Sequence, residues 1–224
     1  MSRVAQVLAL PKQFGKTGGY DLQVVSSQAS VQDYLDALNR AVEELPLSRS
    51  RNKGTDCAGC DLCCGERAPL TWPDIGRLRK HLGLNGELQS LLDRVAHIAV
   101  DGPVVDITLR RAEDGHCCFL DRSKKLCTIY PARPLVCQTF ICCNGTGRAA
   151  GVRKWVVNLG EDELVRQWLQ QAAARGEKPR YHWGNRPNLR LDDWQPNAFT
   201  GLKQYCQVLL KDILPPDLWH KLLK

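Results

Sequence analysis

Cysteines crowd one short stretch of this chain. Cys57, Cys60, Cys63 and Cys64 fall within eight residues, and the two Cys-x2-Cys steps share Cys60. This spacing lets two sulfurs from one turn reach the same metal, as in zinc knuckles and iron–sulfur proteins. Crowded thiols with nothing bound to them oxidise and cross-link. The stretch therefore predicts a site for a metal ion or an inorganic cluster.

A second group of cysteines follows about fifty residues later in the chain. Soft thiolate donors favour zinc, copper(I) or iron–sulfur clusters and argue against magnesium and calcium. We expect Cys57, Cys60 and one of Cys63 and Cys64 to be joined at one centre by a cysteine of the second group, because adjacent cysteines point in different directions. The second group consists of Cys117, Cys118, Cys127, Cys137, Cys142 and Cys143.

The composition is that of an ordinary globular protein. Its 224 residues are 43% hydrophobic and 25% charged, which is enough to bury a core without covalent staples. Ten of the eleven cysteines lie between positions 57 and 143, whereas disulfide frameworks spread their half-cystines over the scaffold. The N-terminus is a poor signal peptide, and no apolar run approaches the ~18 residues of a membrane span. We expect a cytoplasmic protein with reduced thiols and no membrane partner.

The formal net charge of +7 is unevenly distributed. Residues 144–224 carry 13 basic and 8 acidic side chains, so most of the excess is C-terminal. A weakly basic region of this kind is usually a solvated surface. We expect a protein partner or substrate, with nucleic acid as the less favoured alternative.

Hydrophobic periodicity predicts helices separated by short strands. Ser30 is a suitable N-cap for a helix that Pro46 would end, and Thr71 caps a second helix ending at Gly83. An extended arm or strand pair is expected over 1–29, and a polar linker over 48–54. The expected helices cover 31–45, 71–83, 86–98, 161–175, 199–214 and 216–223, and the expected strands cover 103–111, 152–159 and a return from Cys117.

These elements predict an α+β fold with a small, irregular, cysteine-rich metal-binding core that contains short strands and is flanked by helices. The expected organisation has an N-terminal arm and helix at 1–56 and a cysteine-cluster metal-binding domain at 57–150. A C-terminal strand and helical region at 151–224 would pack on that core. Cys206 is expected to pack in the core from a helix.

The order and spacing of the cysteines resemble those of the CxxCxxCC (YkgJ-like) family of zinc- or iron-chelating proteins. The similarity rests on Cys57-x2-Cys60-x2-Cys63-Cys64, on Cys117-x-Phe119-Leu120, and on Cys127-Thr-Ile-Tyr-x2-Arg-Pro-x2-Cys137. Leu70-Thr71 and Asp74-Ile75 match as well. The resemblance covers roughly residues 57–143 and implies metal or iron–sulfur binding. The ligands it implies are Cys57, Cys60, Cys63, Cys64, Cys117, Cys127 and Cys137.

This sequence departs from the family pattern at a few positions. Cys118 stands where the family commonly has proline, and Gln138 where it commonly has arginine. Together with the extra Cys142-Cys143 pair, Cys118 forms a set of additional candidate ligands. His116, beside Cys117, is a further backup ligand.

Two residues of the motif are expected to support the ligands. Pro134 favours an extended backbone at Arg133 and fixes the turn that presents Cys137. The Arg133 guanidinium could donate a hydrogen bond to sulfur or offset thiolate charge, or form an ordinary salt bridge. Tyr130 is the second residue expected to support the ligands.

Two functions follow from these patterns. The first is an iron–sulfur protein with one 4Fe–4S cluster that transfers electrons or assists a protein-modification reaction, since the thiols are too many for a single zinc. The second is a zinc-stabilised binding module whose basic C-terminal region engages a protein or nucleic acid. An enzyme that uses its metal as a Lewis acid is less favoured, because no general base can be identified.

Overall fold

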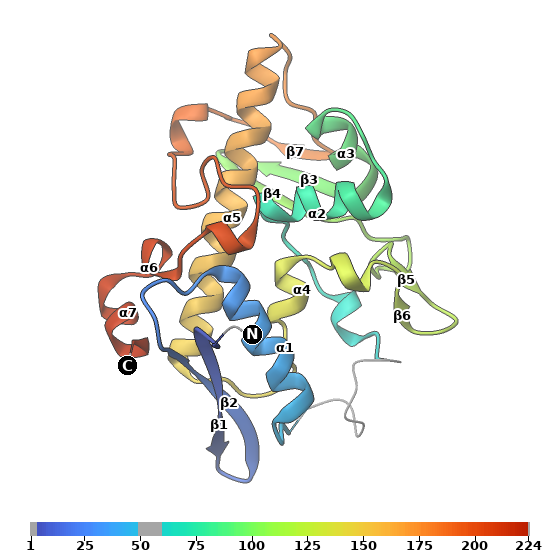
Figure 1. The fold of residues 1–224 in the computed structure, drawn as a ribbon. Coiled ribbons are helices and arrows are strands. Elements are labelled where there is room, and N and C mark those ends of the chain that lie inside the picture. Colours follow the sequence, from blue (N-terminus) through green and yellow to red (C-terminus); the bar gives the residue numbers. More distant parts are fainter. Residues whose placement is uncertain (1–3, 49–59, 224) are drawn as a thin grey trace.

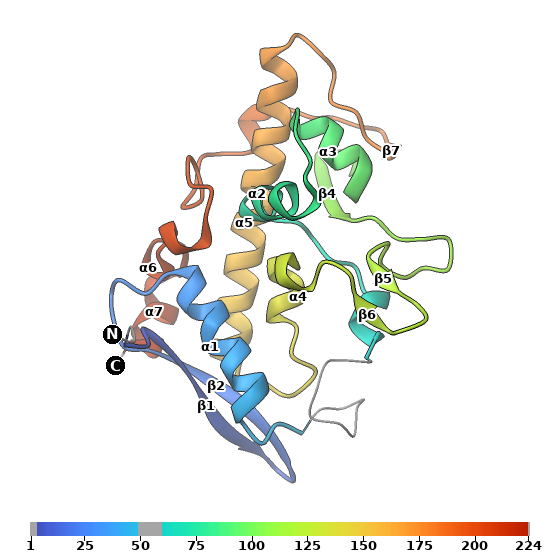
Figure 2. The same cartoon turned by 45° about the vertical axis from the view of Figure 1, so that its right-hand side comes forward.

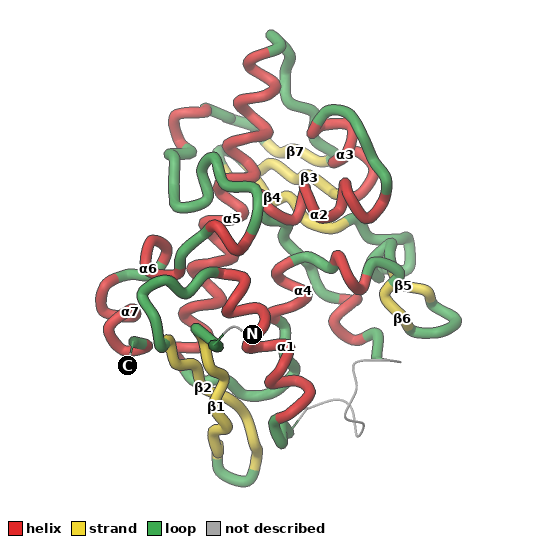
Figure 3. The backbone as a smooth tube through the Cα atoms, in the orientation of Figure 1, coloured by secondary structure: helices red, strands yellow, loops and turns green. Residues whose placement is uncertain are grey.

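The computed structural model describes residues 4–48 and 60–223. Cys57 and all but Ser48 of the expected polar linker lie outside these ranges. The fold is α+β, as the periodicity predicts, with helices packed around short, separate sheets (Figures 1 and 3). No helix within the described residues is both long and apolar enough to cross a membrane.

The N-terminal third forms a hairpin and a helix. Strands β1 (Val7–Phe14) and β2 (Thr17–Val24) pair antiparallel, which confirms a strand pair in this region. Helix α1 (Val31–Glu44) begins at a capping box in which Ser30 and Asp33 bond each other's backbone N–H groups. The apolar face of α1 packs against the hairpin.

The middle of the chain holds α2 (Trp72–Leu82), α3 (Leu88–Val95), β3 (Ala96–Asp101) and β4 (Val104–Leu109). A capping box of Thr71 and Asp74 starts α2, and Gly83 ends it in the left-handed conformation, as expected. The expected helix over 86–98 is too long, because Ala96 already begins a strand whose side chains alternate between buried and exposed. Strand β3 pairs antiparallel with β4 and parallel with β7 (Trp183–Asn185).

Short elements follow around the second cysteine group. These are the hairpin β5 (Leu120–Asp121) and β6 (Leu126–Cys127), the 3-10 turn η2 (Tyr130–Ala132) and helix α4 (Leu135–Thr139). The expected returning strand at Cys117 is reduced to a single antiparallel bridge with Arg111. The strand that starts at Leu120 pairs with β6 instead.

Helix α5 (Gly147–Ala174) overturns the strand expected at 152–159. The run of β-branched residues that suggested a strand lies in the helix with Val152, Val156 and Val157 buried on one face. The same residues therefore also fit a period of 3.6 residues. With 28 residues α5 is about 42 Å long. In both ribbon views it runs along most of the molecule (Figures 1 and 2).

The C-terminal region is less helical than expected. Gly201 has φ +77°, which an ordinary helix does not tolerate, and the 199–214 segment contains only the turn η4 (Tyr205–Gln207) and α6 (Leu210–Ile213). Cys206 is exposed in η4 and does not pack in the core, whereas its neighbour Tyr205 is buried. Helix α7 (Pro216–Leu222) closes the chain, and η3 (Leu191–Asp193) lies in the preceding loop.

Two hydrophobic cores result, and α5 contributes to both. The first core joins β1–β2, α1, α4, α6, α7 and the start of α5. The second core joins α2, α3, β3–β4 and the end of α5, where Trp168 is almost fully buried. The cysteine-bearing turns and the β5–β6 hairpin lie beside the junction of these cores (Figure 2).

Gly160 allows α5 to approach the start of α2 closely. A Cβ atom at Gly160 would lie 2.8 Å from the Cβ and Cγ2 atoms of Thr71, which is fully buried. Gly160→Val should lower the free energy of unfolding by about 1–3 kcal/mol, the usual cost of overpacking. Gly147→Val is the matched control in the same helix, because nothing lies within 4 Å of the corresponding Cβ.

Chemical denaturation of both variants measures the difference in stability. Equal unfolding midpoints for the two valine variants would contradict the close packing of α5 against Thr71.

Candidate metal centre

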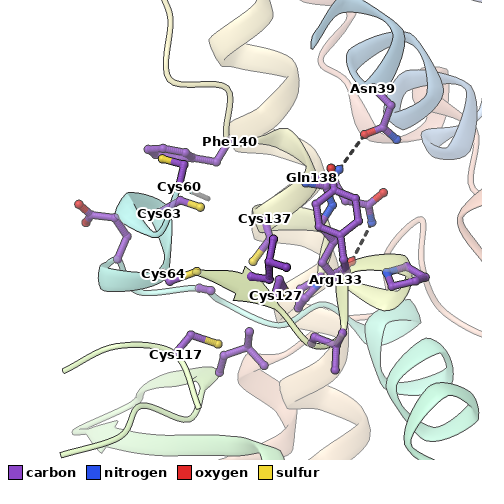
Figure 4. Close-up of a pocket in the computed structure, with 18 of the residues that line it drawn as sticks. Asn39, Cys60, Cys63, Cys64, Cys117, Cys127, Arg133, Cys137, Gln138 and Phe140 are labelled. Atoms are coloured by element: carbon purple, nitrogen blue, oxygen red, sulfur yellow. Dashed lines mark hydrogen bonds between the residues drawn. The ribbon is translucent and has the colours of Figure 1, made fainter. Parts of the chain in front are cut away.

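Six described cysteines line one cavity of about 970 Å³. They come from separate stretches of the chain: the turn η1 (Leu62–Gly65) with its flanking residue, the segment before β5, the strand β6, and helix α4. Figure 4 shows the sulfurs of Cys63 and Cys64 on one side of the cavity and that of Cys137 on the other. The six are Cys60, Cys63, Cys64, Cys117, Cys127 and Cys137.

The backbone holds these segments together without any disulfide among the six. All six are free thiols. Cys117 donates its N–H to the carbonyl oxygen of Cys64 at 2.8 Å, so the two cysteine groups meet through the main chain. Arg111 donates to the carbonyl oxygens of Gly65 and Gly115, which fixes the ends of both cysteine segments. The expected convergence of residues 60–64 with residues 117–137 is therefore present.

The other predicted positions lie apart from this group. Cys118, Cys142 and Cys143 do not line the cavity, and Cys143 packs against the first core near Tyr20. His116 faces Asp114 instead of the cavity. Cys57 lies outside the described residues, so its place at the centre stays a prediction.

Arg133 and Tyr130 both line the cavity, as expected for residues that support the ligands. The guanidinium carbon of Arg133 lies 4.1 Å from the centre of the Tyr130 ring, and its Nη2 donates to Asn39 of α1 at 3.1 Å. Gln138 donates to the Arg133 carbonyl oxygen at 2.8 Å. The positive charge of Arg133 helps to lower the pKa of Cys63, and at Cys127 it opposes the larger effect of burial, which raises the pKa.

The far wall of the cavity comes from a helix that the cysteine pattern does not reveal. Gln32, Asn39, Val42 and Glu43 of α1 line it. The rim contains Phe140, which lies beside Cys60 in Figure 4 and has 43% of its surface exposed. A helix that ends 16 residues before the first described cysteine thus completes the site, and only its amphipathic pattern was visible in the sequence.

The thiols divide into two classes by their acidity. Hydrogen bonding from the Cys64 thiol lowers the pKa of Cys63 to about 6, and the same bond raises the pKa of Cys64. Burial raises the pKa values of Cys127 and Cys137, and the negative charges of neighbouring thiolates raise both further. One cavity therefore holds several sulfurs that resist simultaneous ionisation.

A soft cation resolves this conflict, because metal binding stabilises the thiolate form and displaces the protons. The donor set fits zinc or an iron–sulfur centre, each of which is commonly held by four cysteine thiolates. Among the residues the structure describes, no three His, Cys, Asp or Glu side chains already stand in the arrangement of a metal site. The six cysteines line a common cavity instead.

Thiol acidity leads to a prediction for metal-free protein. The Cys117 thiol bonds that of Cys118 and lowers its pKa to about 7 at an exposed position. Alkylation of Cys118 by iodoacetamide should therefore rise steeply around pH 7, whereas Cys137, whose pKa is raised, should react far more slowly. Peptide mass spectrometry after timed labelling from pH 6 to 8 measures both rates.

Cys117→Ala supplies the matched control, since it removes the hydrogen bond and should slow the labelling of Cys118 at pH 7. Labelling of Cys137 as fast as that of Cys118 would be inconsistent with this difference in acidity.

Comparison with known proteins supports the same chemistry. Residues 56–164 match the model of the CxxCxxCC family, whose description is "putative zinc- or iron-chelating domain". No curated protein and no solved structure matches the chain. The matched segment contains all six thiols of the cavity together with Arg133 and Tyr130. Residues 56–164 thus match a zinc- or iron-chelating domain, and this match supports metal binding as the general function of that segment.

Proposed function

We propose that the cavity binds one 4Fe–4S cluster and that the protein transfers electrons or assists a protein-modification reaction. The observation that carries this proposal is the number of thiols: six described cysteines line one cavity, whereas one zinc ion takes four ligands. A 4Fe–4S cluster also takes four cysteines but spans several metal ions, so its ligands can stand further apart around a common space.

The residues around the thiols suit a redox centre. When bound, such a cluster supplies one-electron chemistry, and its potential depends on nearby charge, hydrogen bonds and solvent access. Arg133 places a positive charge at the cavity, held in position by Asn39 and Tyr130. Burial and repulsion between neighbouring thiolates make the thiols costly to ionise, and the positive charge of the irons would offset this cost.

An open rim would give a partner access to the centre. Tyr130 and Phe140 line the cavity with 50% and 43% of their surfaces exposed. Aromatic residues are enriched in protein interfaces. We infer that a protein partner or substrate approaches from this side, with no membrane involved.

Zinc is the second candidate, because the family description covers zinc as well as iron. A structural zinc bound by four of the six thiolates would be closed to further ligands. The excess of basic residues in 144–224 would then engage a protein or, less favourably, a nucleic acid. If the protein shows no salt-dependent binding to DNA or RNA, nucleic acid is excluded as its partner.

The two candidates differ in colour and composition. Protein purified without oxygen should be brown, with broad visible absorption, iron and acid-labile sulfide. Cys127→Ser should lose most of the iron and absorption, because Cys127 lies at the cavity. Cys206→Ser should retain both, because Cys206 is exposed in η4, outside the cavity.

Colourless protein with stoichiometric zinc would favour the zinc-stabilised module. Protein that holds neither metal after anaerobic purification and reconstitution would refute both candidates. Equal iron in the two serine variants would remove Cys127 from the ligand set.

A further inference from the structure

One buried carboxylate joins three separate segments beneath the cavity. Asp74 has no exposed surface and accepts four hydrogen bonds. Thr71 donates its N–H at 2.9 Å and its hydroxyl at 2.8 Å. The N–H of Leu135 and the hydroxyl of Tyr205 donate at 2.9 and 2.6 Å. Asp74 therefore connects the start of α2, the start of α4 and the turn η4.

The bond to Leu135 replaces the missing cap of α4. Pro134 stands at the N-cap position and provides no side-chain hydrogen bond, so the first N–H groups of α4 need another acceptor. Asp74 provides it from a different helix, where its Oδ1 accepts the N–H of Leu135. A helix of five residues is too short to be stable alone. Its position therefore depends on contacts of this kind.

Cys137 lies two residues beyond Leu135, in the first turns of the same helix. Whatever fixes the start of α4 also fixes the direction of the Cys137 side chain into the cavity (Figure 4).

Tyr205 completes the arrangement from outside the cysteine domain. Its hydroxyl lies 2.7 Å from that of Thr71 and 2.6 Å from Asp74, and the residue is buried. It lies 41 positions beyond the end of the family match at residue 164. The C-terminal region therefore contacts the residue that caps α4.

We propose that Asp74, supported by Thr71 and Tyr205, is a positioning residue of the metal centre that holds Cys137 toward the bound metal. The proposal rests on the proposed function in one respect, namely that Cys137 is a ligand. Beyond that function, the proposal states that the metal centre depends on the C-terminal region, because the hydroxyl of Tyr205 supports Asp74.

Tyr205→Phe and Asp74→Asn test the proposal, and Tyr34→Phe is the matched control. Tyr34 is also fully buried, but its hydroxyl has no hydrogen-bond partner among the described residues. Competition with a chromophoric chelator measures the affinity for cobalt(II), a single ion that takes thiolate ligands as zinc does and reports on them by its absorption. Loss of a residue that orients a ligand typically weakens metal binding by about 10–100-fold. We expect such a loss in Tyr205→Phe and Asp74→Asn, and wild-type affinity in Tyr34→Phe.

The thiolate-to-cobalt absorption band gives a readout that a general loss of stability would not change. We expect it to shift in Tyr205→Phe, which removes one oxygen atom and is the variant that should fold even where Asp74→Asn does not. Wild-type affinity and spectrum in Tyr205→Phe would overturn the proposal.

Labelling of Cys137 in metal-free protein separates this proposal from the proposed function. Release of α4 should increase the rate of iodoacetamide labelling at Cys137 in Tyr205→Phe while leaving Cys118 unchanged, because Cys118 is not on that helix. Wild-type protein that binds no metal would refute the proposed function, and the labelling rate would then decide alone whether Asp74 and Tyr205 position Cys137. An unchanged rate at Cys137 would show that they do not.

Discussion

Electrostatic repulsion between crowded thiolates is the constraint on which this structure depends. Several sulfurs face one cavity, and ionisation of any one of them raises the cost of ionising the next. Hydrogen bonds between neighbouring thiols accommodate part of this conflict, since one member of the Cys63–Cys64 pair is acidic and the other is not. The positive charge of Arg133 favours the thiolate forms of both Cys63 and Cys127, although burial still raises the pKa of Cys127. A bound cation would act on all of the sulfurs at once.

The scaffold brings these sulfurs together by using two cores instead of one. The first core fixes α4 against α1 and the start of α5, and the second core fixes the strand that leads to Cys117. Helix α5 contributes to both cores, and the hydrogen bonds of Asp74 to Leu135 and Tyr205 also join them. The polar network of Thr71 and Asp74 lies where α2, α4 and α5 meet, and Gly160 leaves room for it.

Local signals in the sequence were sufficient for elements that carry their own caps. Helix α1 with Ser30 and α2 with Thr71, Asp74 and Gly83 were predicted almost to the residue. The cysteine spacing likewise predicted that the two groups of cysteines would converge, and described cysteines of both groups line one cavity. Local signals failed where a pattern fitted two periods, as in the branched run of α5 around Val156, and where one glycine decided the outcome, as at Gly201.

Long-range contacts could not be read from the sequence at all. The capping box of α2 marked Asp74 as a residue with a local role, and that role exists. Its second oxygen, however, binds Leu135 and Tyr205, which lie 61 and 131 positions away. No periodicity encodes such a contact, because it arises only after the two cores have assembled. The α1 wall of the cavity escaped prediction for the same reason.

The separation of the two cysteine groups along the sequence affects how much a bound metal would stabilise the fold. Between Cys64 and Cys117 the chain forms α2, α3, β3 and β4 and then returns to the cysteine region. There the N–H of Cys117 donates to the carbonyl oxygen of Cys64. Closing a loop of this length costs entropy, which the native hydrogen bonds and packing help to offset. A metal that joins both groups of cysteines would cross-link this junction and so stabilise the folded chain. Because the unfolded chain keeps Cys64 and Cys117 apart, that stabilisation should be largest for ligands drawn from both groups, which is the arrangement that the cavity presents.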